Sequence, residues 1–295
     1  MTTLSFSRFG AGPPLLLLHA LGSSRAAWDP VVPALAERFE VIAVDLPGFG
    51  ASAPLPPGAE PSPAYLAATV AGLLDEQQID RPHVAGNSLG GWIALELAAL
   101  RPVASLTLLG PAGLWRRGTP LYCLVSLRIT RWASRHAPGL LSRLVGHPLG
   151  RILVLGQTHG RPTRVTPGQA RAEIEALGAA TGFEAALAAT AHRHYQAGPA
   201  LDAPVTVAIG SRDLILLPHQ SRHLDQLPPG MRSAALPGCG HVPMSDDPAA
   251  VVGLITASAG PAGRVREAPR RQAASPSVMD PESAPGGHRE QTARQ

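Results

Sequence analysis

The chain has 295 residues, of which 45% are hydrophobic, enough for one large domain with a full core or for two small ones. Its 25 basic residues are all arginine and outnumber the 21 acidic residues, which gives a net charge of +4. No apolar run approaches the roughly 20 residues of a membrane-spanning helix, no signal-peptide pattern opens the chain, and two cysteines cannot form a disulfide framework, so we predict a cytoplasmic protein.

Short apolar segments alternate with longer segments of helical spacing over the first 109 residues. The apolar run 15–19 lies between a Gly/Pro cluster and a Gly/Ser cluster, as expected for a strand buried on both faces. The pattern predicts strands at 4–9, 15–19, 41–45, 84–86 and 105–109, and helices at 28–38, 63–78 and 89–100. This repeated order predicts an α/β fold with a mostly parallel sheet and helices on both faces.

The alternation stops at Gly110-Pro111 and resumes at residue 205. The segment between these points has helical or irregular patterns without clear strand pairing. The rhythm then continues with a strand at 205–210, a helix at 219–226, a strand at 233–236 and a helix at 248–257. We therefore predict a core of residues 1–111 and 200–260, a helical insertion of 112–199, and a disordered tail of 261–295, where apolar residues thin out.

The sharpest motif is Gly86-Asn87-Ser88-Leu89-Gly90-Gly91, which follows a predicted strand and opens a predicted helix. In this position, G-x-S-x-G is typical of a nucleophile elbow, a tight turn that lifts the serine hydroxyl above the sheet. Small residues flank the serine because the strand and helix backbones approach closely. The pattern also arises by chance in chains rich in Ala and Gly, so Ser88 needs catalytic partners elsewhere.

A serine nucleophile needs an imidazole base and a carboxylate that orients the imidazole. Asp213 follows the predicted strand 205–210, and His241 lies in a Gly-rich loop after the strand 233–236. Both therefore reach the carboxyl edge of the sheet, where α/β proteins build their sites. Either residue alone could be an ordinary loop residue, but the joint order Ser, Asp, His favours a catalytic triad.

An oxyanion site is expected beside the nucleophile. The backbone N–H of Leu89 directly follows the serine, and that of Leu21 lies in the loop after the strand 15–19, so these two groups are the predicted donors. His19 is predicted to brace that loop through side-chain hydrogen bonds and not to transfer protons.

Over about residues 4–258 the chain resembles the α/β-hydrolase-fold family. The segment 45–52, Asp-Leu-Pro-Gly-Phe-Gly-Ala-Ser, is similar to that family's D-x-P-G-x-G-x-S turn, and Gly240-His241 is followed by Asp247-Pro248. Ala20 stands where the family usually has Gly after the histidine. A serine nucleophile speaks against the dehalogenase and epoxide-hydrolase branches, which use an aspartate.

The resemblance also implies roles for the matching positions. Ser88 would be the nucleophile, His241 the base and Asp213 the orienting acid. Leu21 and Leu89 would be the oxyanion donors, and no cofactor is required. The insertion 112–199 would be the cap that forms the substrate pocket and excludes water.

The positive charge is concentrated in one segment. Residues 97–172 contain eleven arginines and no acidic residue, a charge of +11, whereas the rest of the chain carries −7. Arginines interleave there with apolar residues: Arg116, Arg117, Arg128, Arg131, Arg135 and Arg143 with Leu121, Leu124, Val125, Leu127, Ile129, Trp132, Leu140, Leu141 and Leu144. One hypothesis is an amphipathic basic face that steers anionic or acylated substrates or makes weak contact with a membrane surface. The alternative is a solvated helix face over an apolar pocket.

Two other classes of site receive little support. His219 and His223 have the i, i+4 spacing of helical metal ligands, and His192 and His194 form an H-x-H, but no carboxylate pattern completes either set. We therefore predict no metal site. Nucleic-acid binding is not predicted either, because the chain has no recognisable binding module and only 4% aromatic residues.

These features predict a serine hydrolase of the esterase or lipase kind, which cleaves a carboxylic ester of an apolar or acylated small molecule through an acyl-enzyme, without a cofactor. One alternative is C–C bond hydrolysis: Gly110-Pro111-Ala112-Gly113-Leu114 resembles the meta-cleavage-product hydrolases, although Val242 stands where those usually carry Trp. The same triad permits cofactor-free peroxidase or acyl-transfer activity. A non-catalytic binding or receptor protein that keeps the fold is the alternative from another class.

Overall fold

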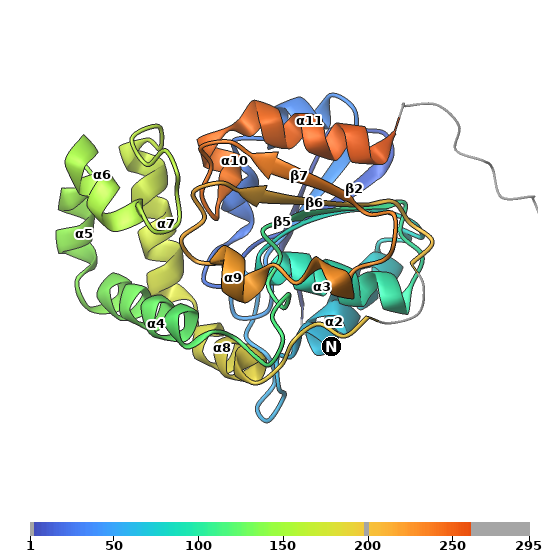
Figure 1. The fold of residues 1–295 in the computed structure, drawn as a ribbon, viewed down its shortest axis with the longest axis horizontal. Helices are drawn as coiled ribbons and strands as arrows, with labels where there is room; N and C mark the ends of the chain where they lie inside the picture. The colour runs from blue at the N-terminus through green and yellow to red at the C-terminus, as the bar shows by residue number, and fades with distance from the viewer. Residues whose placement is uncertain (1–2, 198–200, 261–295) are drawn as a thin grey trace, which may run out of the picture. The chain divides into compact units, whose positions relative to one another are not determined.

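The computed structural model describes residues 3–197 and 201–260. Within these residues the centre is a seven-stranded sheet in the order β1-β3-β2-β4-β5-β6-β7 (Figure 1). β1 is antiparallel to β3, and the other neighbouring pairs are parallel, which confirms the predicted sheet. The strands are β1 (Phe6–Phe9), β2 (Pro14–Leu18), β3 (Glu40–Val44), β4 (His83–Asn87), β5 (Ser105–Leu109), β6 (Val205–Gly210) and β7 (Arg232–Leu236).

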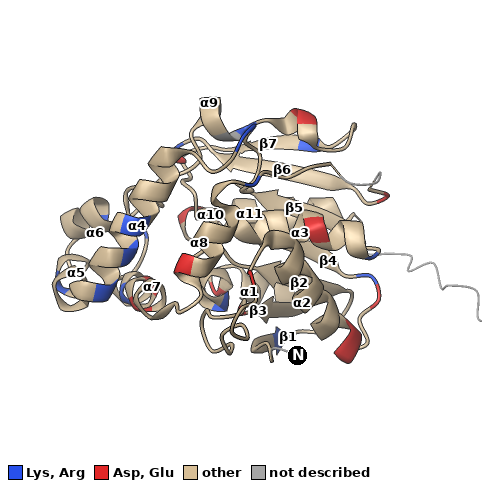
Figure 2. Ribbon diagram, turned by 90° about the horizontal axis from the view of Figure 1, so that it is seen from below, with Lys and Arg blue, Asp and Glu red and all other residues tan. Residues whose placement is uncertain are grey.

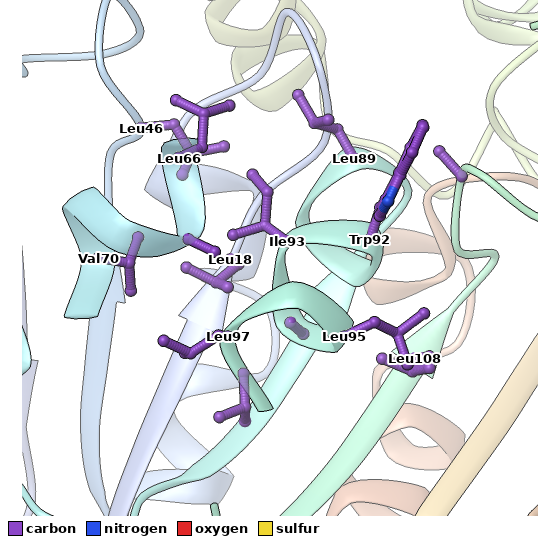
Figure 3. Close-up of a cluster of buried hydrophobic side chains, with 14 of the residues drawn as sticks. Leu18, Leu46, Leu66, Val70, Leu89, Trp92, Ile93, Leu95, Leu97 and Leu108 are labelled. Atoms are coloured by element: carbon purple, nitrogen blue, oxygen red, sulfur yellow. The ribbon is translucent and has the colours of Figure 1, made fainter. Parts of the chain in front are cut away.

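Helices cover both faces of the sheet, because successive side chains of a buried strand point to opposite sides. Leu16 and Leu18 of β2 belong to the core formed with α2 (Pro63–Glu76) and α3 (Leu89–Leu100), part of which Figure 3 shows. Leu15 and Leu17 belong to the opposite core, formed with η1 (Arg25–Trp28), α1 (Val32–Ala36) and α11 (Pro248–Ala259). Burial on both faces thus explains why β2 lacks an alternation of polar and apolar residues.

Two predicted helices are shorter than expected. Within the segment 28–38, the 3-10 turn η1 ends at Trp28 and only the five-residue α1 follows, because Pro30 lacks the backbone N–H that a continuous helix needs. The segment 219–226 forms α9 (Pro218–Ser221) and the 3-10 turn η2 (Leu224–Gln226). A tertiary contact interrupts it: the backbone N–H of His223 donates to the carbonyl of Leu114, 3.1 Å away.

The predicted helical insertion is present between β5 and β6. Its helices are α4 (Leu121–His136), α5 (Pro138–Leu144), α6 (Pro148–Leu155), α7 (Pro167–Ala179) and α8 (Phe183–Ala191). Val145, Leu155, Val165, Ala170 and Ile174 form a small core of their own under these helices. The described residues 3–197 and 201–260 nevertheless belong to one compact unit, so the insertion is packed onto the sheet.

One arginine assigned to the basic face lies elsewhere. Arg131 is buried, and its guanidinium donates to the carbonyl oxygens of Gly178 and Ala180 at the end of α7. These carbonyls have no partner within their own helix, so a buried cation there is satisfied. Including Arg131 in the exposed basic face was therefore wrong, since helical spacing does not distinguish the two sides of α4.

The tail predicted to be disordered, 261–295, lies outside the described residues. In the part of the chain that the structure describes, no helix is both long and apolar enough to span a bilayer.

Cys123 and Cys239 are buried free thiols, and burial raises the pKa of each to about 11.

Candidate active site

Ser88 occupies the turn between β4 and α3 with strained backbone angles, φ 54° and ψ −115°. A non-glycine residue there costs about 1–3 kcal/mol, and such strain persists only where surrounding contacts hold it. Here the N–H of Ser88 donates to Leu109, and its carbonyl accepts from Ala112. A Cβ at Gly86 would lie 2.3 Å from the carbonyl oxygen of Gly90, so the turn leaves room only for glycine. This is the geometry that the G-x-S-x-G motif predicts.

Asp213 and His241 form a buried hydrogen-bonded pair beyond the carboxyl ends of β6 and β7. Oδ2 of Asp213 lies 2.9 Å from Nδ1 of His241. Its Oδ1 accepts the backbone N–H groups of Ile215 and Leu216, at 2.9 and 2.8 Å. An ionised carboxylate only accepts, so it holds the proton of His241 on Nδ1 and leaves Nε2 as the basic nitrogen.

The charge state of Asp213 is set by opposing effects. Burial raises the pKa of a carboxyl group, but the charge and hydrogen bond of His241, together with the two backbone N–H groups, lower the pKa of Asp213 below its ordinary value. Asp213 is therefore a carboxylate at neutral pH, as an orienting acid must be.

The proposed nucleophile and base share one cavity wall. Ser88 and His241 both line a cavity of about 360 Å³, whose wall also includes Leu21 and Leu89. Leu89 is the first residue of α3, so its N–H precedes the first helical hydrogen bond and is available to an oxyanion. The structure thus brings the five sequence-predicted site residues to one edge of the sheet, with Asp213 behind His241.

His19 braces the loop that carries Leu21. Its Nε2 accepts the backbone N–H of Leu46 at 3.0 Å, and its Nδ1 lies 2.7 Å from the carbonyl oxygen of Ala20. This pattern requires a neutral ring protonated on Nδ1. Burial lowers the pKa of His19, partly offset by the Ala20 carbonyl and the charge of Asp45, in keeping with a structural role.

The turn at 45–52 is held by its first residue. The Asp45 carboxylate accepts the backbone N–H groups of Arg25 and Ala51, at 2.7 and 2.9 Å, and pairs with the Arg25 guanidinium. Gly50 adopts φ 54° against it, and a Cβ there would lie 2.2 Å from the carboxyl carbon. The turn therefore ties η1 to the end of β3, next to the His19 loop.

Asp246 is a site residue that sequence reasoning missed. It is fully buried, and its carboxylate accepts three backbone N–H groups: Gly240 at 2.7 Å, Gly160 at 2.8 Å and Arg161 at 2.7 Å. Gly240 immediately precedes His241, whereas the other two belong to the insertion. Asp246 thus joins the His241 loop to the cap. The only available signal was an acidic residue five positions after the histidine, masked by its acidic neighbour Asp247.

Replacing Asp246 with alanine is expected to lower the free energy of unfolding by about 3 kcal/mol, because three N–H groups lose a charged acceptor. It should also lower kcat/KM by at least about ten-fold, because His241 loses the support of its loop. Urea denaturation and initial rates on a p-nitrophenyl ester measure both effects. Asp80→Ala, which removes an exposed carboxylate, is the control. An Asp246→Ala variant as stable and active as this control would contradict the assignment.

The cavity wall beyond Ser88 is mainly apolar. The insertion contributes Leu127, Leu141, Leu144, Ile174 and Leu177 to it. The wall also contains one acidic group, Glu173 of α7, whose Oε1 lies 3.5 Å from Nε2 of the buried His159. Burial lowers the pKa of His159, but the nearby charges of Glu173 and Asp246 and hydrogen bonds to its ring raise that pKa overall. The acidic group in the wall therefore has a basic partner, and the rest of the insertion's contribution is mainly apolar.

The histidine pairs with metal-ligand spacing lie at or beyond the ends of short helices: His192 follows α8, and His223 follows α9. Among residues 3–197 and 201–260, no cluster of three or more His, Cys, Asp or Glu side chains is arranged to hold a metal ion. The local reason is that α9 ends at Ser221, so His219 and His223 do not share one helix face.

Comparison with known proteins agrees with this geometry. A family model described as the alpha/beta hydrolase fold matches residues 13–248, more than half of the chain. The chain belongs to the α/β hydrolase fold family. As an α/β hydrolase, it carries its helical insertion after β5, and the paired Asp213 and His241 follow β6 and β7.

Similar proteins differ in the reactions for which they are named. Pimeloyl-[acyl-carrier protein] methyl ester esterase of Aeromonas hydrophila is 49% identical over 100 residues, a match covering 34% of this chain and 37% of that esterase. Epoxide hydrolase EphH of Mycobacterium tuberculosis is 32% identical over 200 residues, covering 66% of this chain and 94% of that protein. The structure of the enol-lactonase from Burkholderia xenovorans LB400 is 25% identical, with a TM-score of 0.67 over 87% of this chain and 96% of that one.

Proposed function

We propose that this α/β hydrolase is a serine esterase that cleaves a carboxylic ester of an apolar or acylated small molecule. The observation that carries the proposal is the Asp213–His241 pair, whose imidazole shares the wall of an apolar cavity with Ser88 on its strained turn. The esterase and the enol-lactonase among the similar proteins support ester chemistry by their names.

The chemistry proceeds in two halves. Nε2 of His241 takes the proton of Ser88 as Oγ attacks the ester carbonyl, and Asp213 stabilises the imidazolium that forms. The N–H groups of Leu21 and Leu89 bind the oxyanion. The carbonyl–oxygen bond breaks, the alcohol leaves with the proton from His241, and water deacylates Ser88 by the same proton relay.

A serine favours an ester over an epoxide as substrate, although one similar protein is named an epoxide hydrolase. Attack of a serine oxygen on an epoxide carbon would leave an ether. Water cannot reverse an ether by carbonyl addition, whereas the ester formed by attack on a carbonyl is readily hydrolysed. Turnover with Ser88 therefore requires a carbonyl substrate.

A fluorophosphonate probe tests whether the site is catalytic. We expect stoichiometric labelling of the wild-type protein at Ser88, read by mass spectrometry of the labelled peptide, and no labelling of His241→Gln, because the serine then lacks its base. Absence of labelling on the wild-type protein would favour the binding-protein alternative.

A chain-length series of p-nitrophenyl esters tests the substrate class. We expect kcat/KM to rise with acyl length while the chain fills the apolar wall, by about three-fold or more per added methylene, and to fall when the chain exceeds the cavity. A dienone-acid substrate of the meta-cleavage type is run beside it. Faster turnover of the dienone acid than of every ester would replace the ester proposal by C–C hydrolysis.

A further inference from the structure

The cap exposes large apolar side chains on α4 and α6, where a solvated helix would carry polar ones. On α4, Val125, Ile129 and Trp132 follow an i, i+4, i+7 spacing that places them on one face, and Trp132 is 63% exposed. On α6, Leu149, Ile152 and Leu153 are exposed, the first at 80%. We call these six side chains the apolar rim. Exposed apolar clusters of this kind mark interaction sites.

Two members of the apolar rim, one on each helix, line the active-site cavity. Ile129 and Leu153 are both exposed to solvent and both belong to the cavity wall that includes Ser88. The cavity therefore opens to solvent between α4 and α6. A molecule that covered the apolar rim would lie directly over the path to Ser88.

The surface around the rim is basic. Exposed Arg128 and Arg135 lie on α4, and exposed Arg143 lies on α5. Figure 2 shows basic positions in blue on both helices. No acidic residue occurs between 97 and 172. Among the described residues, the carboxylate that pairs with one of these guanidinium groups is Glu184 of α8, 3.7 Å from Arg128. The partner of this surface must therefore be anionic and able to accept apolar side chains.

We propose that the apolar rim and Arg128, Arg135 and Arg143 dock this protein on an anionic phospholipid bilayer, with the cavity opening against the lipid. Trp and aliphatic side chains enter the boundary between headgroups and acyl chains, while arginines bind the phosphates. A second copy of the chain is a poor occupant because it would place like charges opposite one another. Docking in this orientation lets an acylated substrate pass from the bilayer into the cavity without crossing water.

Vesicle sedimentation of the full chain tests the proposal. Using Ser88→Ala protein separates docking from hydrolysis, so failure to bind lipid leaves the proposed esterase untouched. We expect binding to vesicles of equal parts phosphatidylglycerol and phosphatidylcholine, at least ten-fold weaker binding to phosphatidylcholine alone, and weakening as ionic strength rises from about 0.1 M to about 0.5 M. Binding to neither vesicle, or equally to both, would overturn the proposal.

Paired variants assign the surface. The double variants Arg128→Ser/Arg135→Ser and Trp132→Ser/Leu149→Ser should each bind the anionic vesicles roughly ten-fold or more weakly. The matched controls are Arg38→Ser/Arg232→Ser and Phe9→Ser/Leu100→Ser. They remove exposed arginines and exposed apolar side chains that lie outside the cap insertion. These controls should bind within about two-fold of the parent protein. Equal losses in test and control variants would overturn the proposed surface, as would a dimer in sedimentation equilibrium that only Trp132→Ser/Leu149→Ser dissociates.

Tryptophan fluorescence supplies an independent readout. Trp28, Trp92 and Trp115 are buried, whereas Trp132 is exposed, so lipid contact changes chiefly the emission of Trp132. We expect a blue shift on adding anionic vesicles and quenching by lipids brominated near the headgroup. Binding of the vesicles without either change would show that another surface is responsible.

Discussion

Replacing Ser88 with alanine is expected to abolish ester hydrolysis, lowering kcat by at least about 10⁴-fold, because no other group can form the acyl-enzyme. The free energy of unfolding should stay within about 1 kcal/mol of the wild-type value. Alanine adopts the same positive φ with similar strain, and the substitution removes no large buried group. Stopped assays on a p-nitrophenyl ester and urea denaturation measure the two quantities.

Ser23 provides a matched control for this variant. It lines the same cavity but lies in the loop after β2 and not on the strained turn. Ser23→Ala should keep kcat within a few-fold of wild type. If Ser88→Ala retained more than about a tenth of the wild-type kcat in protein free of contaminating esterase, Ser88 would not be the nucleophile.

Replacing Asp213 with asparagine is expected to lower kcat/KM by about 10⁴-fold at neutral pH, almost as much as loss of the nucleophile. The amide oxygen can still accept the N–H groups of Ile215 and Leu216, so the NH₂ group then faces Nδ1 of His241. The imidazole then adopts the other tautomer, in which Nδ1 accepts a hydrogen bond from this NH₂ group and Nε2 carries the proton. In this tautomer it cannot take the proton of Ser88.

The stability of the Asp213→Asn variant provides a second readout. The pKa of Asp213 is lower in the folded than in the unfolded state, so its carboxylate stabilises the fold above the ordinary pKa of 3.8, and this contribution is lost as pH falls through the folded pKa. The variant should therefore be less stable than wild type at pH 7, with the difference shrinking below pH 3.8. Asp225→Asn changes an exposed carboxyl group and should alter neither the activity nor the pH dependence of the activity. Activity of Asp213→Asn within ten-fold of wild type would remove Asp213 from the site.

The amino-acid sequence alone determined the order of strands and helices in the core. β2 is uniformly apolar because both its faces are buried, and helices such as α3 have lengths and boundaries that short-range periodicity reveals. It also predicted that Ser88, Asp213 and His241 lie near one another, because residues that directly follow parallel strands meet at the same sheet edge. This inference needs only local patterns and the rule that crossovers carry the chain back to the same edge.

The tertiary structure decided what depends on contacts between distant segments. Asp246 reaches Gly160, 86 positions away, and Arg131 turns inward to satisfy the carbonyl groups of α7; neither contact has a local sequence signal. The packing of the cap helices likewise separates buried from exposed arginines and opens the cavity beside Ile129 and Leu153. The net charge of +4 is a property of the sequence, but only the fold shows that Arg128 and Arg135 of α4 are exposed while Arg131 is buried, because helical periodicity does not state which side of a helix a neighbour covers.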